Sequence, residues 1–323
     1  MCFKDKIILL TGGTGSFGKK FTKILLERGS PKAIRIFSRD ELKQWEMEKE
    51  FSNNKKLRFF LGDIRDKERL ERAMDGVDIV VHAAALKQVP ACEYNPFEAI
   101  KTNILGAQNI IEAAIDHNLE KVLAISTDKA VNPVNIYGAT KMCMEKIFIN
   151  ANAYVGSRRT KMACVRYGNV VGSRGSVIPL FKEQRKTGTI TITDQRMSRF
   201  WITLDRGVDF VMKSVDLMKG GETFIPKIPS MKIIDLASLM APGCRIKSIG
   251  IRPGEKVYES LITEDEARHT REYKDLFIIF PEGSWWNGKR IPGGKTLPDG
   301  YRYTSENNQD WLTAEQLKKV AGI

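Results

Sequence analysis

The 323-residue chain has the composition of a folded globular protein, with 42% hydrophobic and 28% charged residues, and it can bury one large core or two modest ones. Its net charge of +13 does not indicate a nucleic-acid partner, because lysine and arginine are mixed with acidic residues and no nucleic-acid-binding motif accompanies them. We expect no secretion signal and no membrane span, and five scattered cysteines with three histidines, none at ligand spacing, predict a cytoplasmic protein without a metal site.

Short apolar runs alternate with helical patterns over the first 168 residues. We expect strands at Lys6–Thr11, Ala33–Ser38, Leu57–Leu61, Val77–Ala83, Lys121–Ser126 and Met162–Tyr167. Between the fourth and fifth of these strands, apolar residues recur at the 3.6-residue spacing of a helix, at Ile100, Ile104, Ala107, Ile111 and Ala114. Such βαβ units predict an α/β fold with a doubly wound parallel sheet of the Rossmann type, whose ligands bind beyond the carboxyl ends of the strands.

After residue 168 this alternation ends, and glycine, proline and short β-like stretches dominate. We therefore predict two lobes, a Rossmann domain over residues 1–168 and a smaller C-terminal α/β lobe over residues 169–323. One helix, near residues 205–218, is expected to pack back on the first lobe. Trp285 and Trp286 in the glycine-rich tail favour packing or an oligomer contact over a sugar-stacking surface.

A glycine-rich turn, TGGTGSFG, directly follows the first expected strand. Its glycines Gly12, Gly15 and Gly18 are spaced by three residues and precede an apolar helix. Glycines allow the backbone to turn tightly and to approach a pyrophosphate, whose charge is bound by the free N–H groups of a helix N-terminus. The turn therefore predicts a dinucleotide site, which also includes Thr14, Ser16 and Phe17.

The end of the second strand decides which dinucleotide is bound, because an acidic residue there would bind the ribose 2′-hydroxyl of NAD. Ser38 and Arg39 stand at this place, and a hydroxyl with a guanidinium suits the 2′-phosphate of NADP. Asp40 keeps NAD open, and Lys43 is either a second cation for the phosphate or an ordinary solvated lysine. We expect NADP. Asp63, which ends the third strand, suits either a contact with the adenine edge or a capping role.

The segment NIYGATK places Tyr137 and Lys141 four residues apart, so that they share one face of a helix. A tyrosine is a poor base at neutral pH, but an adjacent ammonium and a positive nicotinamide ring favour its phenolate. That phenolate accepts a hydroxyl proton while a hydride leaves for the cofactor. Together with Ser126 and Thr127 on the preceding strand and with the glycine turn, these residues resemble the extended short-chain dehydrogenase/reductase superfamily.

Asp128 and Lys129 follow Thr127 and narrow the reaction. Once carbon 4 of a sugar is a ketone, the proton on carbon 5 is acidic, and a base removes it while an acid protonates the departing hydroxyl of carbon 6. The Asp-Lys pair, within STDKAVNPVNIYGATK, resembles the inverting UDP-N-acetylglucosamine 4,6-dehydratases, whereas retaining hexose dehydratases carry Asp-Glu there. The resemblance extends through SRDELKQ, HAAALKQVP, VRYGNVVGSRGSV, SRFWITLD, PKIPSMK and IRPGEK, and these stretches are distributed over almost the whole chain.

The resemblance implies a role for each residue of this group. It makes Lys129 the base at carbon 5 and Asp128 the acid at carbon 6. Tyr137 and Lys141 are then the oxidising pair, with Thr127 polarising the oxygen of carbon 4, and the hydride taken from carbon 4 is returned to carbon 6. A lysine base must be partly neutral, and we expect burial near Lys141 and the nicotinamide to lower the pKa of Lys129.

The same resemblance implies the remaining binding residues. The NADP site gains Ile64, Ala83 and Lys87. We expect the diphosphate and uridine of UDP-N-acetylglucosamine to lie between the lobes, against Lys87, Asn169, Ser173, Arg174, Ile178, Thr193, Met197, Arg252 and Glu255. Among these, Lys87 and Arg252 suit the phosphates, and Asn169 offers both a donor and an acceptor.

The function implied by the resemblance is the first step of pseudaminic acid biosynthesis for flagellin glycosylation. We also expect a homo-oligomer in the cytoplasm. Two other interpretations stay open. A nucleotide-sugar 4-epimerase or retaining dehydratase is disfavoured by Lys129. A non-enzymatic NADP-binding protein is disfavoured by the intact Tyr137 and Lys141.

Overall fold

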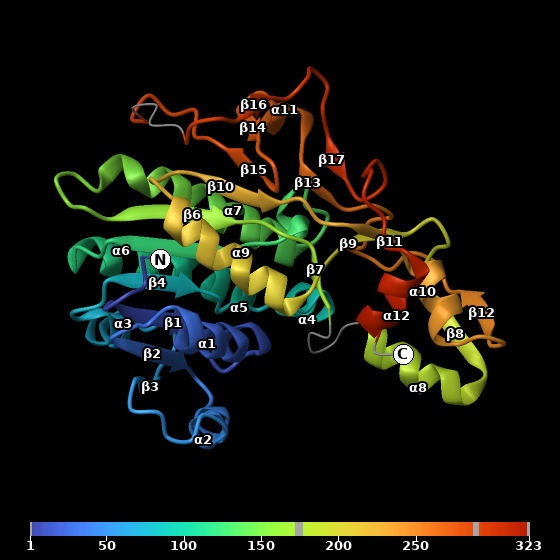
Figure 1. The fold of residues 1–323 in the computed structure, drawn as a ribbon, viewed down its shortest axis with the longest axis horizontal. Coiled ribbons are helices and arrows are strands. Elements are labelled where there is room, and N and C mark those ends of the chain that lie inside the picture. Colours follow the sequence, from blue (N-terminus) through green and yellow to red (C-terminus); the bar gives the residue numbers. More distant parts are fainter. Residues whose placement is uncertain (1, 172–176, 287–290, 322–323) are drawn as a thin grey trace.

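A computed structural model describes residues 2–171, 177–286 and 291–321, and its largest element is one ten-stranded sheet (Figure 1). Six parallel strands follow one another in the order β3-β2-β1-β4-β5-β6, which is the order of a Rossmann sheet. Their bounds are Ile7–Thr11 for β1, Ala33–Ser38 for β2, Leu57–Leu61 for β3, Ile79–His82 for β4, Lys121–Ile125 for β5 and Lys161–Val165 for β6. The predicted fold class is thus confirmed.

The large sheet continues with strands that come from the C-terminal half of the chain. Next to β6 lies β10, Thr223–Pro226, which is also parallel. Three antiparallel strands then complete the sheet, namely β15 at Leu276–Ile279, β14 at Thr270–Glu272 and β16 at Lys295–Thr296. The chain beyond residue 168 thus returns to the large sheet. The predicted division into two lobes at that residue stays a prediction.

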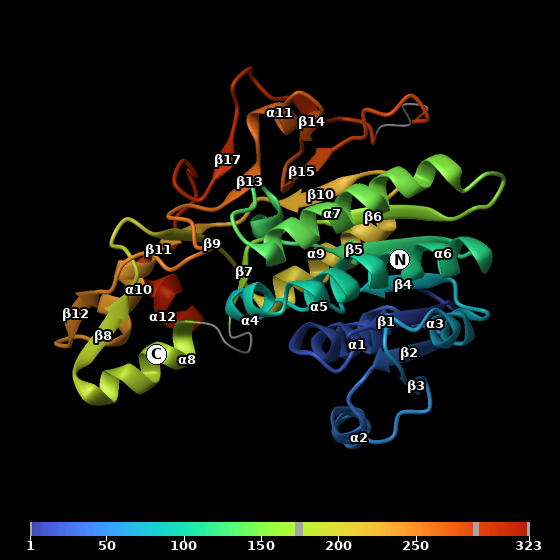
Figure 2. The same cartoon turned by 180° about the vertical axis from the view of Figure 1, so that it is seen from behind.

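Helices cover both faces of the sheet, because alternate residues of each strand point to opposite sides. Ile8 and Leu10 pack in one apolar core with residues of α1, Ser16–Arg28, and α9, Leu204–Leu217, which lie side by side in Figure 1. Leu9 packs in a second core with residues of three helices seen in front of the sheet in Figure 2, namely α3 at Lys67–Met74, α6 at Gly106–Asp116 and α7 at Ile136–Asn150.

The helical pattern predicted from Ile100 to Ala114 is interrupted by a wider turn. A short helix α5, Pro96–Ile100, leads into a π-helical turn at Lys101–Leu105, after which α6 begins. The extra residue per turn leaves Ile104 only partly buried and turns Asn103 inward. Asn103 then binds both backbone groups of Leu86, each at 2.9 Å, and so fixes the loop that follows β4.

Three smaller sheets form a region that lies beside the carboxyl ends of the parallel strands. One joins β11, Ser230–Lys232, and β7, Asn169–Val170, to the central strand β9, Ser198–Ile202. A second pairs β8, Thr189–Ile192, with β12, Arg245–Ser248, and a third pairs β13, Ser260–Ile262, with β17, Tyr303–Thr304. The remaining helices are α2 at Glu41–Glu50, α4 at Val89–Tyr94, α8 at Val177–Gln184, α10 at Ile233–Met240, α11 at Glu264–Ala267 and α12 at Ala314–Ala321. Within the described ranges, every helix is too short or too polar to span a membrane.

Candidate active site

A cavity of about 1350 Å³ extends from the glycine turn after β1, past the ends of β2, β4 and β5, to the smaller sheets. It is larger than most single-ligand pockets. Most of the predicted site residues line it, namely Gly12, Thr14, Gly15, Ser16, Phe17, Ser38, Arg39, Asp40, Lys43, Asp63, Ile64, Ala83, Lys87, Thr127, Asp128, Lys129, Tyr137, Lys141, Asn169, Thr193, Met197, Arg252 and Glu255. The large sheet and the smaller sheets thus both contribute to one site.

Two of the predicted residues that the structure describes, Gly18 and Ile178, do not line the cavity. Ser173 and Arg174 lie outside the described residues. Gly18 packs helix α1 against the turn, because a Cβ at this position would lie 2.2 Å from the carbonyl oxygen of Gly13. Ile178 is buried among the apolar residues beneath α8 and β8.

The glycine turn is built for a close approach of another group to its backbone. Gly12 has a φ of +67°, a left-handed conformation that favours glycine, and the N–H of Gly15 donates to its carbonyl at 3.0 Å. Helix α1 then begins without a side-chain cap, and its first residues, Ser16 and Phe17, line the cavity. Its N-terminal N–H groups are of the kind that bind phosphate.

At the end of β2, a set of charged side chains surrounds the adjoining part of the cavity. The carboxylate of Asp40 caps α2 by accepting from the N–H of Lys43 at 3.0 Å, and it also binds the ammonium group of Lys43. The guanidinium of Arg39, which is half exposed, lies 3.4 Å from Asp63. Burial alone would raise the pKa of Asp63, but hydrogen bonds from Arg65 lower it, so this carboxyl stays ionised.

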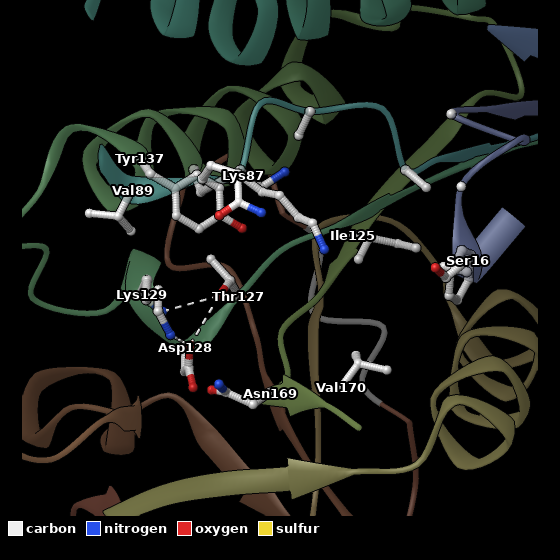
Figure 3. A pocket seen from close by; sticks show the side chains of 18 of the residues that line it. Ser16, Lys87, Val89, Ile125, Thr127, Asp128, Lys129, Tyr137, Asn169 and Val170 are labelled. Atoms are coloured by element: carbon white, nitrogen blue, oxygen red, sulfur yellow. Dashed lines mark hydrogen bonds and ion pairs between the residues drawn. The ribbon is translucent and has the colours of Figure 1, made fainter. Parts of the chain in front are cut away.

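The loop after β5 carries the predicted acid and base. The hydroxyl of Thr127 donates to Asp128 Oδ1 at 3.0 Å, and Lys129 Nζ donates to the same oxygen at 3.1 Å. Two backbone hydrogen bonds to the end of β6 and the residues just after it hold this loop, one from Ser126 to Val165 and one from Asp128 to Tyr167. Figure 3 shows Lys87 and Tyr137 on one side of the pocket and Asp128 and Asn169 on the other.

Helix α7 presents the predicted tyrosine and lysine. The side chain of Asn135 caps this helix by accepting from the N–H of Gly138 at 2.7 Å, and its amide donates to the carbonyl of Gly254 at 2.7 Å. Burial raises the pKa of Tyr137 to about 12, although Lys129 and a hydrogen bond with Thr127 oppose the rise. Burial lowers the pKa of Lys141 to about 8. With a pKa of about 12, Tyr137 is therefore an uncharged phenol near neutral pH.

Lys129 differs from the sequence-based expectation, which was a lowered pKa. Burial does disfavour its charged form, but Asp128 and Glu259 together outweigh burial and raise its pKa. Glu259 is the second carboxylate, and its Oε1 lies 3.1 Å from Lys129 Nζ. The pKa of Asp128 is raised as well, chiefly because the side chain is fully buried, with Glu259 adding to the effect and Lys129 opposing it.

Several buried polar atoms at the cavity have no hydrogen-bond partner within the described part of the chain. Apart from Glu259 Oε2, which forms an ion pair with Lys256 Nζ at 3.2 Å, these atoms are Thr102 Oγ1, Ser126 Oγ, Asp128 Oδ2, Asn169 Oδ1 and Trp201 Nε1. Because a buried polar atom without a partner costs free energy, their clustering at one cavity indicates that a polar ligand satisfies them. Trp201 Nε1 can only donate, and Asp128 Oδ2 can donate when the carboxyl is protonated.

Sequence reasoning missed Glu259, Arg199 and Trp201, all of which line the cavity. Arg199 and Trp201 lie in the stretch SRFWITLD, which carried the resemblance without a role for either residue. Glu259 follows IRPGEK by a few residues and belongs to no motif. The predicted substrate residues Arg252 and Glu255 contact each other, with Arg252 Nη1 3.9 Å from Glu255 Oε1. Burial lowers the pKa of Lys87.

Comparison with known proteins identifies relatives over nearly the full length. Residues 8–281 match the family described as polysaccharide biosynthesis protein. The chain is 51% identical to the UDP-N-acetylglucosamine 4,6-dehydratase (inverting) of Campylobacter jejuni, with 98% of each chain covered. It is 44% identical to the UDP-glucose 4-epimerase of Rickettsia conorii, over 98% of this chain and 96% of that relative.

A solved structure is similar over the same extent. Pen from Bacillus thuringiensis superposes with a TM-score of 0.91 at 42% identity, over 99% of this chain and 98% of that chain. These matches confirm the resemblance predicted from the motifs. The chain belongs to the polysaccharide biosynthesis protein family, within the extended short-chain dehydrogenases/reductases.

Proposed function

We propose that this chain is a 4,6-dehydratase that converts UDP-N-acetylglucosamine into a 4-keto-6-deoxy sugar with inversion at carbon 5. The observation that carries the proposal is the pair of buried Asp128 and partly buried Lys129 in the same cavity as Tyr137. Elimination of water across carbons 5 and 6 needs an acid and a base in addition to the group that deprotonates the carbon 4 hydroxyl. The name of the Campylobacter jejuni relative supports the same reaction.

The residues at the strand ends fit NADP as the cofactor. The uncapped start of α1 suits a pyrophosphate, and Ser38 and Arg39 at the end of β2 suit a 2′-phosphate. Asp40, the residue that would favour NAD, caps α2 and pairs with Lys43, so its carboxylate is already engaged. When bound, NADP supplies a hydride acceptor that can later give the hydride back.

Tyr137 is proposed to take the proton of the carbon 4 hydroxyl. Because burial holds the pKa of its phenol near 12, the residue must gain a positive neighbour before it ionises near neutral pH. The positive charge of an oxidised nicotinamide would provide that change on binding, and Lys129 and Thr127 already act in the same direction. Lys141 Nζ lies 3.1 Å from Met144 Sδ, and it adds a positive charge to the site when it is protonated.

Asp128 and Lys129 obtain their two catalytic forms from one proton shift. If a proton moves along the 3.1 Å hydrogen bond from Lys129 Nζ to Asp128 Oδ1, the ion pair becomes a neutral amine and a neutral carboxylic acid. These are the base that removes the carbon 5 proton and the acid that protonates the leaving hydroxyl of carbon 6. The net charge of the pair is unchanged, so a buried site does not have to accept an additional charge.

Incubation of the purified protein with UDP-N-acetylglucosamine and NADP tests this function. We expect a product whose mass is lower than that of the substrate by one water, without net consumption of NADP, because the hydride is returned. Omission of NADP after removal of any co-purified nucleotide should abolish the conversion. A product with the mass of the substrate would contradict the proposal.

A nucleotide-sugar 4-epimerase is the second candidate, and the Rickettsia conorii relative is the observation that favours it. An epimerase needs Tyr137 and the cofactor but no acid and base for carbons 5 and 6. The fully buried position of Asp128 and the two carboxylates around Lys129 favour the dehydratase. The product mass separates the two, because epimerisation leaves the mass unchanged.

Cofactor choice gives a prediction on one residue. We expect NADP to bind at least about tenfold more tightly than NAD, since a charged hydrogen bond contributes about 1.5–3 kcal/mol. Arg39→Asp should reduce or reverse this ratio, because it removes the guanidinium and adds a repelling carboxylate. Fluorescence titration with both nucleotides measures it. Arg58→Asp makes the same charge change outside the cavity lining and should leave the ratio as in the wild type. An unchanged ratio in Arg39→Asp would refute this interpretation of the β2 end.

The wider role is also a proposal. The resemblance places the reaction at the start of pseudaminic acid biosynthesis for flagellin glycosylation, and the five scattered cysteines suit the cytoplasm. We also expect the protein to be a homo-oligomer.

A further inference from the structure

Glu259 occupies a buried position beside the proposed acid and base. Its side chain is 2% exposed, and its carboxylate lies among three cations. The Oε1 atom is 3.1 Å from Lys129 Nζ and 3.8 Å from Arg199 Nε, and Oε2 is 3.2 Å from Lys256 Nζ. Lys129 is therefore held between two carboxylates, those of Asp128 and Glu259.

The backbone of Glu259 is fixed by the C-terminal tail. Its N–H donates to Ser305 Oγ at 3.0 Å, and the N–H of Ser305 donates to the carbonyl of Glu259 at 2.8 Å. Ser305 is fully buried, and its hydroxyl also lies 2.8 Å from that of Ser198, at the start of β9. The position of Glu259 beside Lys129 is thus set by the pairing of its backbone with the tail next to β13 and β17.

The charge of Glu259 is permanent over the range in which enzymes work. Burial alone would raise its pKa, but Lys129, Arg199 and Lys256 lower it to about 2. A fixed negative charge at this distance favours the protonated forms of both neighbours, Lys129 and Asp128. Within the described residues, four titratable side chains surround Asp128 and Lys129. They are Glu259, Arg199 and Lys256 from the region of the smaller sheets and Tyr137 from α7.

We propose that Glu259 is a positioning residue of the reaction: it holds Lys129 beside Asp128, and its negative charge sets the pH range in which that pair carries one shared proton. The inference rests on the proposed function, since it concerns the step at carbons 5 and 6. The state with one proton is the productive one, because it can become the neutral amine with the neutral acid. It exists between the loss of the first proton and the loss of the second from the coupled pair.

Single-turnover kinetics of Glu259→Gln test the proposal. In this experiment the rise of reduced cofactor reports oxidation at carbon 4, and its decay reports the later steps. Removing the negative charge lowers the pKa of both Lys129 and Asp128, so both limbs of the pH profile of the decay should move to lower pH, by about one pH unit. The pH profile of the rise should move less, because Tyr137 does not contact Glu259. A folded variant whose decay keeps the wild-type pH profile would overturn the proposal.

A second variant separates position from charge and covers the case in which Glu259→Gln does not fold. Glu259→Asp keeps the charge but withdraws it from Lys129 by one methylene. We expect a decay about tenfold slower, with its pH profile in the wild-type range. A decay with the wild-type rate would contradict the positioning role. Thermal unfolding and titration with NADP show whether each variant is folded and binds the cofactor as the wild type does.

Glu266→Gln is the matched control. Glu266 is a carboxylate that also has an arginine partner, 2.8 Å from Arg166, but it is only partly buried and does not line the cavity. The control should lose stability and keep both pH profiles, so a shift in this variant as well would assign the effect to general destabilisation and overturn the proposal. If the wild type does not release water from UDP-N-acetylglucosamine, the proposed function fails. If it does and Glu259→Gln keeps its decay profile, only this inference fails.

Discussion

Tyr137→Phe should lower the turnover number by about 10²–10⁴-fold, because the substitution removes the only atom proposed to take the proton of the carbon 4 hydroxyl. The ring stays in place, so the buried packing around α7 should be kept. Because oxidation at carbon 4 is the first step, no reduced cofactor should form in a single turnover, and the absorbance of the reduced nicotinamide measures this directly.

Tyr154→Phe provides the matched control for this loss. Tyr154 is 65% exposed and does not line the cavity, so its hydroxyl should be dispensable. Thermal unfolding of Tyr137→Phe should stay close to that of the wild type. A folded Tyr137→Phe variant that turns over near the wild-type rate would remove Tyr137 from the oxidation step.

Lys129→Ala should block the reaction after oxidation, and reduced cofactor should accumulate in place of product. Tyr137, Lys141 and the glycine turn are kept, so oxidation at carbon 4 remains available, although it should be slower because Lys129 no longer lowers the pKa of Tyr137. The base for carbon 5, by contrast, is gone. The variant also leaves two buried carboxylates without their shared cation, and we expect a loss of about 3–5 kcal/mol in the free energy of unfolding. Absorbance of the reduced nicotinamide and the mass of the product measure the block.

Two controls are needed to interpret a loss of activity in Lys129→Ala. Binding of NADP shows whether the destabilised variant keeps its site at the assay temperature. Lys213→Ala removes an exposed lysine that pairs with Asp275 outside the cavity, and it should convert substrate at the wild-type rate. Full formation of a dehydrated product by Lys129→Ala would show that another group removes the carbon 5 proton.

The features that could be predicted from the sequence are those that depend on residues close together in the chain. The strands β2 and β3 have the predicted bounds, because alternating apolar residues and the following turns are local signals. The glycine turn and the Tyr137 to Lys141 spacing are likewise read within a few residues, and the structure brings them to one cavity. The topology of a doubly wound sheet accounts for this convergence, since it gathers the loops at the carboxyl ends of the strands.

What escaped prediction depends on contacts between distant segments. Glu259 reaches Lys129 from 130 positions further along the chain, and its backbone is set by Ser305, so no local pattern signals its role. For the same reason the expected lowering of the pKa of Lys129 was wrong for this structure, because the expectation counted burial and nearby cations without the second carboxylate. The π-helical turn that directs Asn103 inward was also hidden, because its apolar residues still fit a regular helical period.

The reaction in deuterium oxide tests the central claim most directly. Wild-type protein, UDP-N-acetylglucosamine and NADP are incubated in this solvent, and the product is analysed by mass spectrometry and nuclear magnetic resonance. The account predicts a product that has lost one water, carries one solvent deuterium at carbon 5, and has the inverted configuration there, because the proton removed from carbon 5 is replaced from a group that exchanges with solvent. A product that keeps all its oxygen atoms, has no deuterium at carbon 5 and differs from the substrate only at carbon 4 would contradict it and make the protein an epimerase.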